Sequence, residues 1–595
     1  MLEEKTWWSM AVDRRVHYYV LFILTILIAS SLYLSWIAES GQGTIDLERT
    51  GIEVEPGRNV NFTVYTPREH TYSGFMPVVL TIHGVGGSKE SMYAFNIELA
   101  RRNFTVVSVD LAGHGDSNVL FEWDSYDRLA DDCYEALQYV WQNYAGTAPG
   151  VYGVIGHSLG WHVGLAMYDQ PTPPEALVAV GPVWIDEVVS IPASTLLASG
   201  QFDELIPPGK LLTEFQTITG NSSAEAGVTY GNLTEGTAYR LILGGSNHIT
   251  EISDQLIVIE SVTWMIQALQ GEDQLIHTLK FWRPYFRTYD LVYRNRAIAY
   301  VVGAFSLLAS LIPLLIIISE RLPKRISARP ILLEENRIPP KLAAMVSISL
   351  AAMMVTLYAI TGYSFQAIGD PDFLWLNIYN SSGLIVFFLL WPLVTVLFMM
   401  LILKEQTLRQ LLNGLGYKSG NPSSLLKASA SAIVPTLICI LWLTIWMRLG
   451  DLTETTIILP ILRIPIDQRL VGILILMIFA LPLSIADALW SDLLLPAKAW
   501  DSYRHQFREL AMAFILRLAP LTAFAFAMAY GSTFLGIVAG PSVVLGLLLL
   551  YFIIASTAAT FILFLTSSRF KNPWPAIFVN AFLYSWILVN SMPLV

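Results

Sequence analysis

Blocks of about twenty apolar residues recur along this chain and constrain its fold more than any other feature. Such a block can cross a hydrocarbon layer of ~30 Å as a helix. We expect nine of these helices, near residues 16–37, 297–318, 342–363, 382–403, 428–449, 469–490, 510–531, 543–566 and 574–593. A re-entrant piece near residues 533–541 leaves eight or ten helices as alternatives. Residues 297–595 are thus expected to form a polytopic membrane domain of about eight helices.

The cations between these blocks predict the orientation of the chain in a cell membrane. Lys and Arg gather on alternate connections, whereas the short connection 362–379 carries neither. By the positive-inside rule, residues 1–15 are cytoplasmic and residues 16–37 form an uncleaved signal anchor, with a cleaved signal peptide as the alternative. The same rule puts residues 45–270 outside the cytoplasm. Five Asn-x-Ser/Thr sequons fall on that outer side: Asn61, Asn103, Asn221, Asn232 and Asn380.

Charge separates a water-soluble domain from the rest of the chain. Residues 45–270 hold 27 acidic and 9 basic residues, and the remainder holds 20 and 27. An acidic domain disfavours nucleic acid as a partner. With 54% hydrophobic and only 14% charged residues, the chain is also neither disordered nor a wholly cytosolic enzyme. Residues 271–296 mix aromatic and basic side chains, which suits a linker among membrane lipid headgroups or simply the basic flank of a helix.

Within residues 45–270, short β-branched runs alternate with helix-like stretches. Strands separated by helices predict a mostly parallel sheet that helices sandwich on both faces. Residues 45–66 predict a leading antiparallel pair, and residues 127–144 predict a helix. The expected core strands are 78–82, 105–109, 151–155, 176–180, 195–199 and 239–243.

The pentapeptide 156–160 reads Gly-His-Ser-Leu-Gly and lies between an expected strand and an expected helix. A Gly-x-Ser-x-Gly turn in this context is tight enough to lift the serine hydroxyl clear of the sheet. It also aims a helix N-terminus at negative charge that develops during a reaction. The sequence therefore predicts Ser158 as a nucleophile.

Two later strand ends supply candidate partners for Ser158. Asp203 follows strand 195–199, with Glu204 as the competing acid, and His248 follows the last expected strand. An imidazole can take the proton of a serine hydroxyl as general base, and a carboxylate can orient that imidazole. We expect His248 and Asp203 in these two roles.

The bend 82–87, which reads Ile-His-Gly-Val-Gly-Gly, ends an earlier strand. A glycine-rich bend lets a backbone N–H reach the carbonyl oxygen of a substrate, although an ordinary turn is the alternative. We expect the N–H groups of Val85 and Leu159 to form an oxyanion hole. Three residues inside or beside these motifs are expected to shape the substrate pocket: His83, Gly84 and His157.

Together with residues 110–117, which look like a D-x-x-G-x-G-x-S turn, these motifs resemble the α/β-hydrolase superfamily. Within it, the monoglyceride-lipase-like and dienelactone-hydrolase-like branches are the most similar. The order Ser158, Asp203, His248 is the order expected of this superfamily. The resemblance covers residues 45–270. It implies serine-dependent hydrolysis of ester, thioester or amide bonds through an acyl-enzyme, without metal or organic cofactor.

The spacing departs from many lipases of that superfamily at one place. Only about 14 residues separate strands 176–180 and 195–199, where those lipases insert a helical cap. No cap fits here. The pocket is therefore expected to be open, or to be covered by residues 211–237 or by loops of the membrane domain.

The function expected from the sequence is that of a membrane-anchored, extracytoplasmic serine hydrolase of acyl esters or thioesters, with lipids among the candidate substrates. Acyl transfer or peptide cleavage by the same triad remains an alternative, because acceptor choice depends on how the pocket excludes water. A transporter or scaffold whose hydrolase-like domain only binds ligand is the alternative from another class.

Two ionisable residues, Asp487 and Arg517, fall inside expected membrane helices at similar depth. A lone charge in hydrocarbon is costly, so we expect the two side chains to pair. A substrate or ion path is the alternative reading of the pair.

Overall fold

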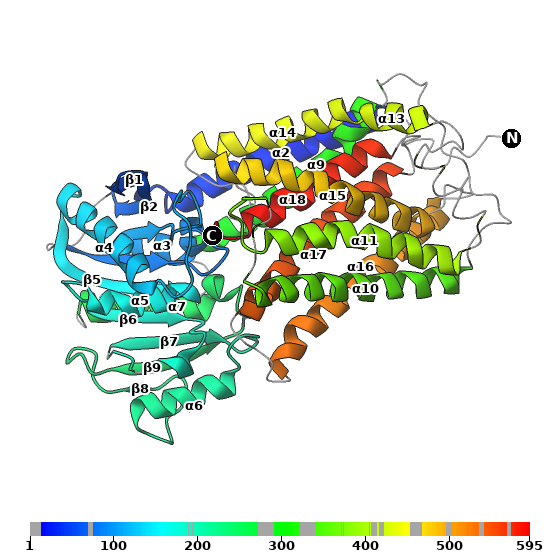
Figure 1. The fold of residues 1–595 in the computed structure, drawn as a ribbon. Coiled ribbons are helices and arrows are strands. Elements are labelled where there is room, and N and C mark those ends of the chain that lie inside the picture. Colours follow the sequence, from blue (N-terminus) through cyan, green and yellow to red (C-terminus); the bar gives the residue numbers. More distant parts are fainter. Residues whose placement is uncertain are drawn as a thin grey trace.

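The computed structural model shows a domain with a twisted sheet beside a bundle of long helices (Figure 1). The linker 271–296 and the N-terminal residues 1–15 fall largely outside the described residues. These are 14–68, 75–188, 190–192, 194–271, 291–319, 321, 339–369, 372, 374–403, 405, 413, 415, 422–452, 467–494, 503–534, 541–567 and 573–595.

The nine-stranded sheet has the order β1-β2-β4-β3-β5-β6-β7-β9-β8. Its centre is parallel from β4 to β9, and only β1, β2 and β8 pair antiparallel. All six expected core strands and the leading pair are present. The strands are β1 (Ile45–Glu55), β2 (Arg58–Pro67), β3 (Met76–Ile82), β4 (Thr105–Val109), β5 (Thr147–His157), β6 (Ala176–Val180), β7 (Thr195–Gly200), β8 (Thr229–Tyr230) and β9 (Tyr239–Gly244).

Alternation along the central strands builds two apolar layers. On β3, Val79 joins the layer under α3 (Tyr93–Ala100) and α7 (Gln255–Leu269). Its neighbours Val78 and Leu80 join the opposite layer, under α4 (Tyr126–Asn143) and α5 (Leu159–Ala166). Successive side chains of a strand point to opposite faces, so helices must cover both sides of this sheet. The sandwich of sheet and helices expected from the sequence is confirmed.

The helical bundle contains every segment in which a membrane helix was expected. Within the described residues, seven helices are long and apolar enough to cross a membrane, so the count of nine spans is not confirmed. The bundle helices are α2 (Arg14–Glu39), α9 (Tyr293–Ser319), α10 (Pro340–Ala367), α11 (Ser381–Ile402), α13 (Pro422–Ala430), α14 (Ile433–Leu452), α15 (Asp467–Leu494), α16 (Tyr503–Phe534), α17 (Pro541–Ser567) and α18 (Trp574–Asn590).

Asp487 and Arg517 meet in the interior of this bundle, and both are fully buried. Nη2 of Arg517 lies 2.9 Å from Oδ2 of Asp487, and the Tyr584 hydroxyl donates to the same oxygen at 2.6 Å. The guanidinium also donates to Oγ of Ser491 at 2.6 Å and lies 4.8 Å from the centre of the Trp490 ring. A charge pair with this many partners suits a structural role that joins α15, α16 and α18.

One junction between the two parts is formed by α2 and α9, which enter and leave the sheet domain. Arg296 of α9 pairs with Glu39 at the end of α2, and both side chains are buried. Tyr293 begins α9 inside an apolar layer of the sheet domain, and its N–H donates to Oε1 of Glu98 at 3.2 Å. The helix therefore starts four residues before the expected boundary at residue 297 and is anchored in the core of the sheet domain.

A second junction is formed by residues 591–595, which follow α18. The Leu594 N–H donates to Gly113 O at 2.8 Å, and the Phe121 N–H donates to Leu594 O at 2.7 Å. Arg469 of α15 is buried and donates to carbonyls of Met592 and Gly113 at 2.6 and 2.5 Å. Hydrogen bonds between backbones and a buried guanidinium thus fix one loop of the sheet domain to the bundle.

Candidate active site

Ser158 lies on the turn between β5 and α5 with a φ of +52°, which non-glycine residues rarely adopt. The flanking glycines make the turn possible. A Cβ at Gly156 would fall 2.2 Å from Gly160 O, and one at Gly160 would fall 2.3 Å from Ile82 O. The Ser158 N–H donates to Val180 O at 2.9 Å, which ties the strained turn to the end of β6.

The oxyanion loop, residues 83–87, lies directly against the nucleophile. A Cβ at Gly84 would fall 2.8 Å from Cβ of Ser158, so only glycine lets the loop approach this closely. Leu159 is the first residue of α5, and the first N–H groups of a helix have no hydrogen-bond partner within that helix. The residue before Val85 thus contacts Ser158, and Leu159 follows it directly, while the oxyanion hole formed by their N–H groups stays a prediction.

His83 is the first residue of the oxyanion loop and holds it in place. Both of its ring nitrogens contact backbone groups, so neither is available to a substrate. It is fully buried, its Nδ1 lies 2.8 Å from Gly84 O, and its Nε2 accepts the Leu111 N–H at 3.1 Å. Both ring nitrogens are therefore occupied by backbone groups. His83 thus positions the loop, and its expected part in shaping the substrate pocket stays a prediction.

The D-x-x-G-x-G-x-S turn holds the segment that follows the oxyanion loop. Asp110 accepts the N–H of Lys89 at 2.8 Å and its ammonium at 2.5 Å, and also the Asp116 N–H at 2.8 Å. A Cβ at Gly115 would fall 1.9 Å from the Asp110 carboxyl group, so glycine is required there. The motif was recognisable in the sequence, but this anchoring role was not.

Asp203 and His248 meet at the ends of β7 and β9. Nδ1 of His248 lies 3.1 Å from Oδ2 of Asp203, and both side chains are buried. The other carboxylate oxygen of Asp203 accepts the N–H groups of Leu205 and Ile206 at 2.7 and 3.1 Å. Glu204, the competing acid, accepts the backbone N–H of His248 at 3.2 Å. Asp203 is thus the carboxylate that orients the imidazole.

Asp203 and His248 each shift the pKa of the other in the direction that favours the charged form. Burial raises the pKa of Asp203, but the charge and hydrogen bond of His248, together with hydrogen bonds from Glu251 and the Leu205 N–H, lower the pKa below its usual value. Burial lowers the pKa of His248, but the Asp203 carboxylate outweighs this, and the pKa lies above 6.5. Asp203 therefore stays ionised at neutral pH and stabilises the imidazolium that forms when His248 takes a proton.

Nε2 of His248 is buried and has no hydrogen-bond partner among the described residues. A hydrogen bond from Ser158 to this nitrogen is therefore not formed in this structure, and such bonds often tighten only when substrate binds. Both groups nevertheless lie at the end of β6. A Cβ at Gly181 would fall 2.8 Å from Cε1 of His248, and the preceding residue, Val180, accepts the Ser158 N–H.

His157 holds the loop that carries His248. Its Nε2 lies 3.0 Å from His248 O, and the two ring centres are 4.9 Å apart. Burial, with repulsion from His248, lowers the pKa of His157 to about 3. His157 is therefore neutral at physiological pH and donates to the carbonyl of His248, while its pocket role stays a prediction.

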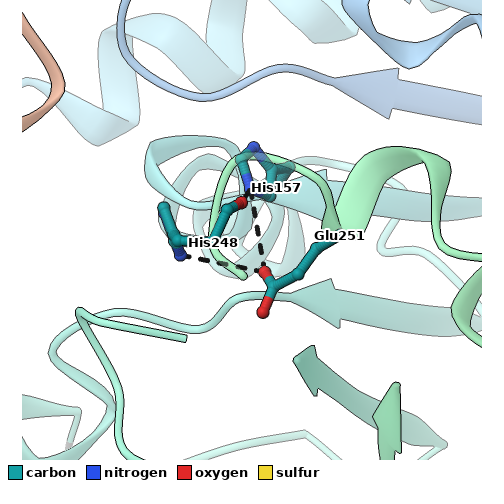
Figure 2. Close-up of side chains that lie close together, drawn as sticks. All are labelled: His157, His248 and Glu251. Carbon is teal, nitrogen blue, oxygen red and sulfur yellow. Dashed lines mark hydrogen bonds and ion pairs between the residues drawn. The ribbon is translucent and has the colours of Figure 1, made fainter. Parts of the chain in front are cut away.

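Glu251 was not anticipated from the sequence. It is fully buried, and Figure 2 shows its carboxyl group pointing at His157 and His248. Its Oε2 lies 3.7 Å from Nδ1 of His248 and 3.9 Å from Nε2 of His157. Nothing in the local sequence distinguishes this glutamate from a surface residue, because its contacts are with distant strand ends.

These same three side chains could in principle hold a metal ion, because their ligand atoms lie within 4.8 Å of one another. Both nitrogens are already engaged, however. His248 Nδ1 lies against Asp203 and His157 Nε2 against a carbonyl oxygen. The cluster therefore fits an orienting role for His248 better than a metal site.

In a comparison with known families, residues 76–277 match the family described as serine aminopeptidase, S33. Many solved structures are similar, and two of them share 17% identity each with this chain. A cold-adapted esterase from an Arctic intertidal metagenomic library matches over 38% of this chain and 95% of its own, with a TM-score of 0.29. A thermophilic esterase from Thermogutta terrifontis matches over 37% and 99%, with a TM-score of 0.27. A search of curated proteins found no match.

The matched segment contains the nucleophile turn, the oxyanion loop and the Asp203–His248 pair. The chain therefore carries an α/β-hydrolase segment, as the sequence resemblance implied. Its function is of the serine hydrolase type.

Two neighbouring acids allow a direct test of the site assignment. Asp203→Asn should lower kcat by about 10⁴-fold, because the imidazole loses its counter-charge and correct tautomer. Glu204→Gln keeps an acceptor for the His248 N–H and should change kcat less than about threefold. Steady-state kinetics of both variants would contradict the assignment if Glu204→Gln were the more damaging change.

Proposed function

We propose that this protein is a membrane-anchored serine hydrolase that cleaves acyl ester or thioester bonds outside the cytoplasm, with acyl lipids as its substrate class. The observation that carries the proposal is the buried Asp203–His248 pair, with Nδ1 and Oδ2 3.1 Å apart. It lies beside a strained nucleophile turn at which Ser158 has a φ of +52°.

In the proposed mechanism, Oγ of Ser158 attacks the acyl carbon while Nε2 of His248 takes its proton. The carbonyl π electrons move to oxygen, which the N–H groups of Val85 and Leu159 bind. Collapse of the tetrahedral intermediate expels the alcohol or thiol, to which His248 returns the proton. Water then attacks the acyl-enzyme in the same way and releases the acid and Ser158.

Lipid as the substrate class is supported by the position of the bundle against the oxyanion loop. A Cβ at Gly86 would fall 2.8 Å from Ser591 O and 4.0 Å from the Tyr551 ring. Val85 packs against apolar clusters of both parts. A reaction site next to apolar helix ends suits a substrate whose acyl chain stays in the membrane while its ester reaches Ser158.

The short connection between β6 and β7 supports the same reading. Its described residues form one 3₁₀ turn, Ile185–Glu187, and contain no helical cap. Cover for an acyl group must then come from elsewhere, and residues 591–595 of the bundle are one segment that contacts the oxyanion loop and the loop at Gly113.

Peptide cleavage is the second candidate function, because the matching family is described as a serine aminopeptidase. Acyl transfer by the same triad, and ligand binding without catalysis, are further outcomes of the tests below.

A substrate panel on the full chain in nanodiscs tests the chemistry. We expect turnover of long-chain acyl esters and monoacylglycerols to exceed that of short soluble esters and aminoacyl anilides, and Ser158→Ala to reduce it to background. Ser222→Ala, an exposed serine outside the site, is the matched control and should be unchanged. Preference for the anilide would favour a peptidase, and activity that survives Ser158→Ala would refute the proposed mechanism.

Sequon use tests the orientation. Asn221 and Asn232 are exposed, so both should receive N-glycans when the chain is made in eukaryotic cells. Glycosidase treatment should then remove a mass that Asn221→Gln and Asn232→Gln each reduce. A sequon inserted at residues 416–421, on the expected cytoplasmic side, should stay unmodified. The opposite pattern would reverse the proposed topology.

A further inference from the structure

Two carboxyl groups converge on one hydroxyl at the end of β7. Oγ of Ser199 lies 3.2 Å from Oδ2 of Asp203 and 3.0 Å from Oε1 of Glu251. All three side chains are buried. A hydroxyl has one proton and cannot donate to both carboxyl groups at once. If both carboxyl groups were ionised, the Ser199 oxygen would therefore face one of the two carboxylate oxygens without a proton between them, and those two oxygens would repel each other.

Groups from four different segments surround the carboxyl group of Glu251. The Gly200 N–H of β7 donates to its Oε1 at 2.5 Å. His157 and His248 approach Oε2 at 3.9 and 3.7 Å, from the nucleophile turn and the loop after β9. Gly181, after β6, lacks the Cβ that would fall 2.3 Å from that oxygen. No Lys or Arg pairs with Glu251 among the residues that the structure describes.

The protonation of the two acids follows from these surroundings. Burial, with the charge of Asp203, raises the pKa of Glu251 well above 4.5, whereas the pKa of Asp203 is lowered by His248. The neighbouring His157 stays neutral, since its pKa is about 3. The two carboxyl groups therefore carry one proton between them at neutral pH, and that proton resides on Glu251 while Asp203 is ionised.

The charge of Glu251 affects how well His248 can act as a base. An ionised Glu251 would put a second negative charge 3.7 Å from Nδ1 of His248. Its attraction would raise the pKa of His248 further, so that less neutral imidazole would be present at neutral pH to accept the Ser158 proton.

We propose that Glu251 is a positioning residue of the triad. As a neutral carboxylic acid, it fixes the end of β7 through Gly200 and Ser199 and leaves Asp203 as the one carboxylate that faces His248. The inference rests on the proposed function, because it assigns Glu251 a part in the same reaction.

The kinetic test compares Glu251→Gln, which keeps a neutral carbonyl acceptor, with Glu251→Ala, which removes it. Glu260→Gln on the outer face of α7 is the matched control. Glu251→Gln should keep kcat within about threefold and leave the acid midpoint of the kcat/KM pH profile in place. Glu251→Ala should lower kcat at least about tenfold with little change in KM. A midpoint that falls by one pH unit or more in Glu251→Gln, or full kcat in Glu251→Ala, would overturn the proposal.

A stability measurement separates this inference from the proposed function, because it requires no turnover. A carboxyl group whose pKa is raised by folding stabilises the folded state below its unfolded pKa and loses that contribution as pH rises. The Tm of the wild-type chain should therefore fall relative to that of Glu251→Gln as pH rises above 4.5. A constant difference, or one of opposite slope, would show that Glu251 is ionised in the folded protein.

Discussion

The strained turn at Ser158 is the constraint on which the rest of the site depends. A positive φ at a serine costs of order 1–3 kcal/mol and persists only where the surroundings determine it. Here those surroundings are the ends of β3 and β6, which the turn contacts through Gly160 and the Ser158 N–H. The ends of neighbouring parallel strands meet at one edge of a sheet, so the turn lies where the loops carrying Asp203 and His248 also arrive.

Buried polar contacts then hold each of those loops in place. His83 and Asp110 fix the oxyanion loop and the segment that follows it, while His157 and Glu204 bind backbone groups of His248. Each of these groups would be costly to bury without its partner, so the contacts specify the loop positions as well as stabilise them. The bundle adds a further constraint through Arg469, which binds the backbone at Gly113.

The sequence was sufficient where local chemistry determines structure. Runs of β-branched residues predicted the six core strands, and paired glycines predicted the turn at Ser158. The preference for Asp203 over Glu204 agrees with the geometry at His248. Long-range contacts could not be predicted in this way. The role of Glu251 depends on Gly200 at the end of β7, 51 residues earlier, and the docking of residues 591–595 on Gly113 leaves no local pattern.

Covalent labelling of the full chain with a fluorophosphonate tests the central claim most directly, because this probe reacts with a serine only where a base activates it. Peptide mass mapping should then find a single adduct, on Ser158, that disappears in His248→Gln. An adduct on another serine, or none under conditions that label a known serine hydrolase, would contradict the account.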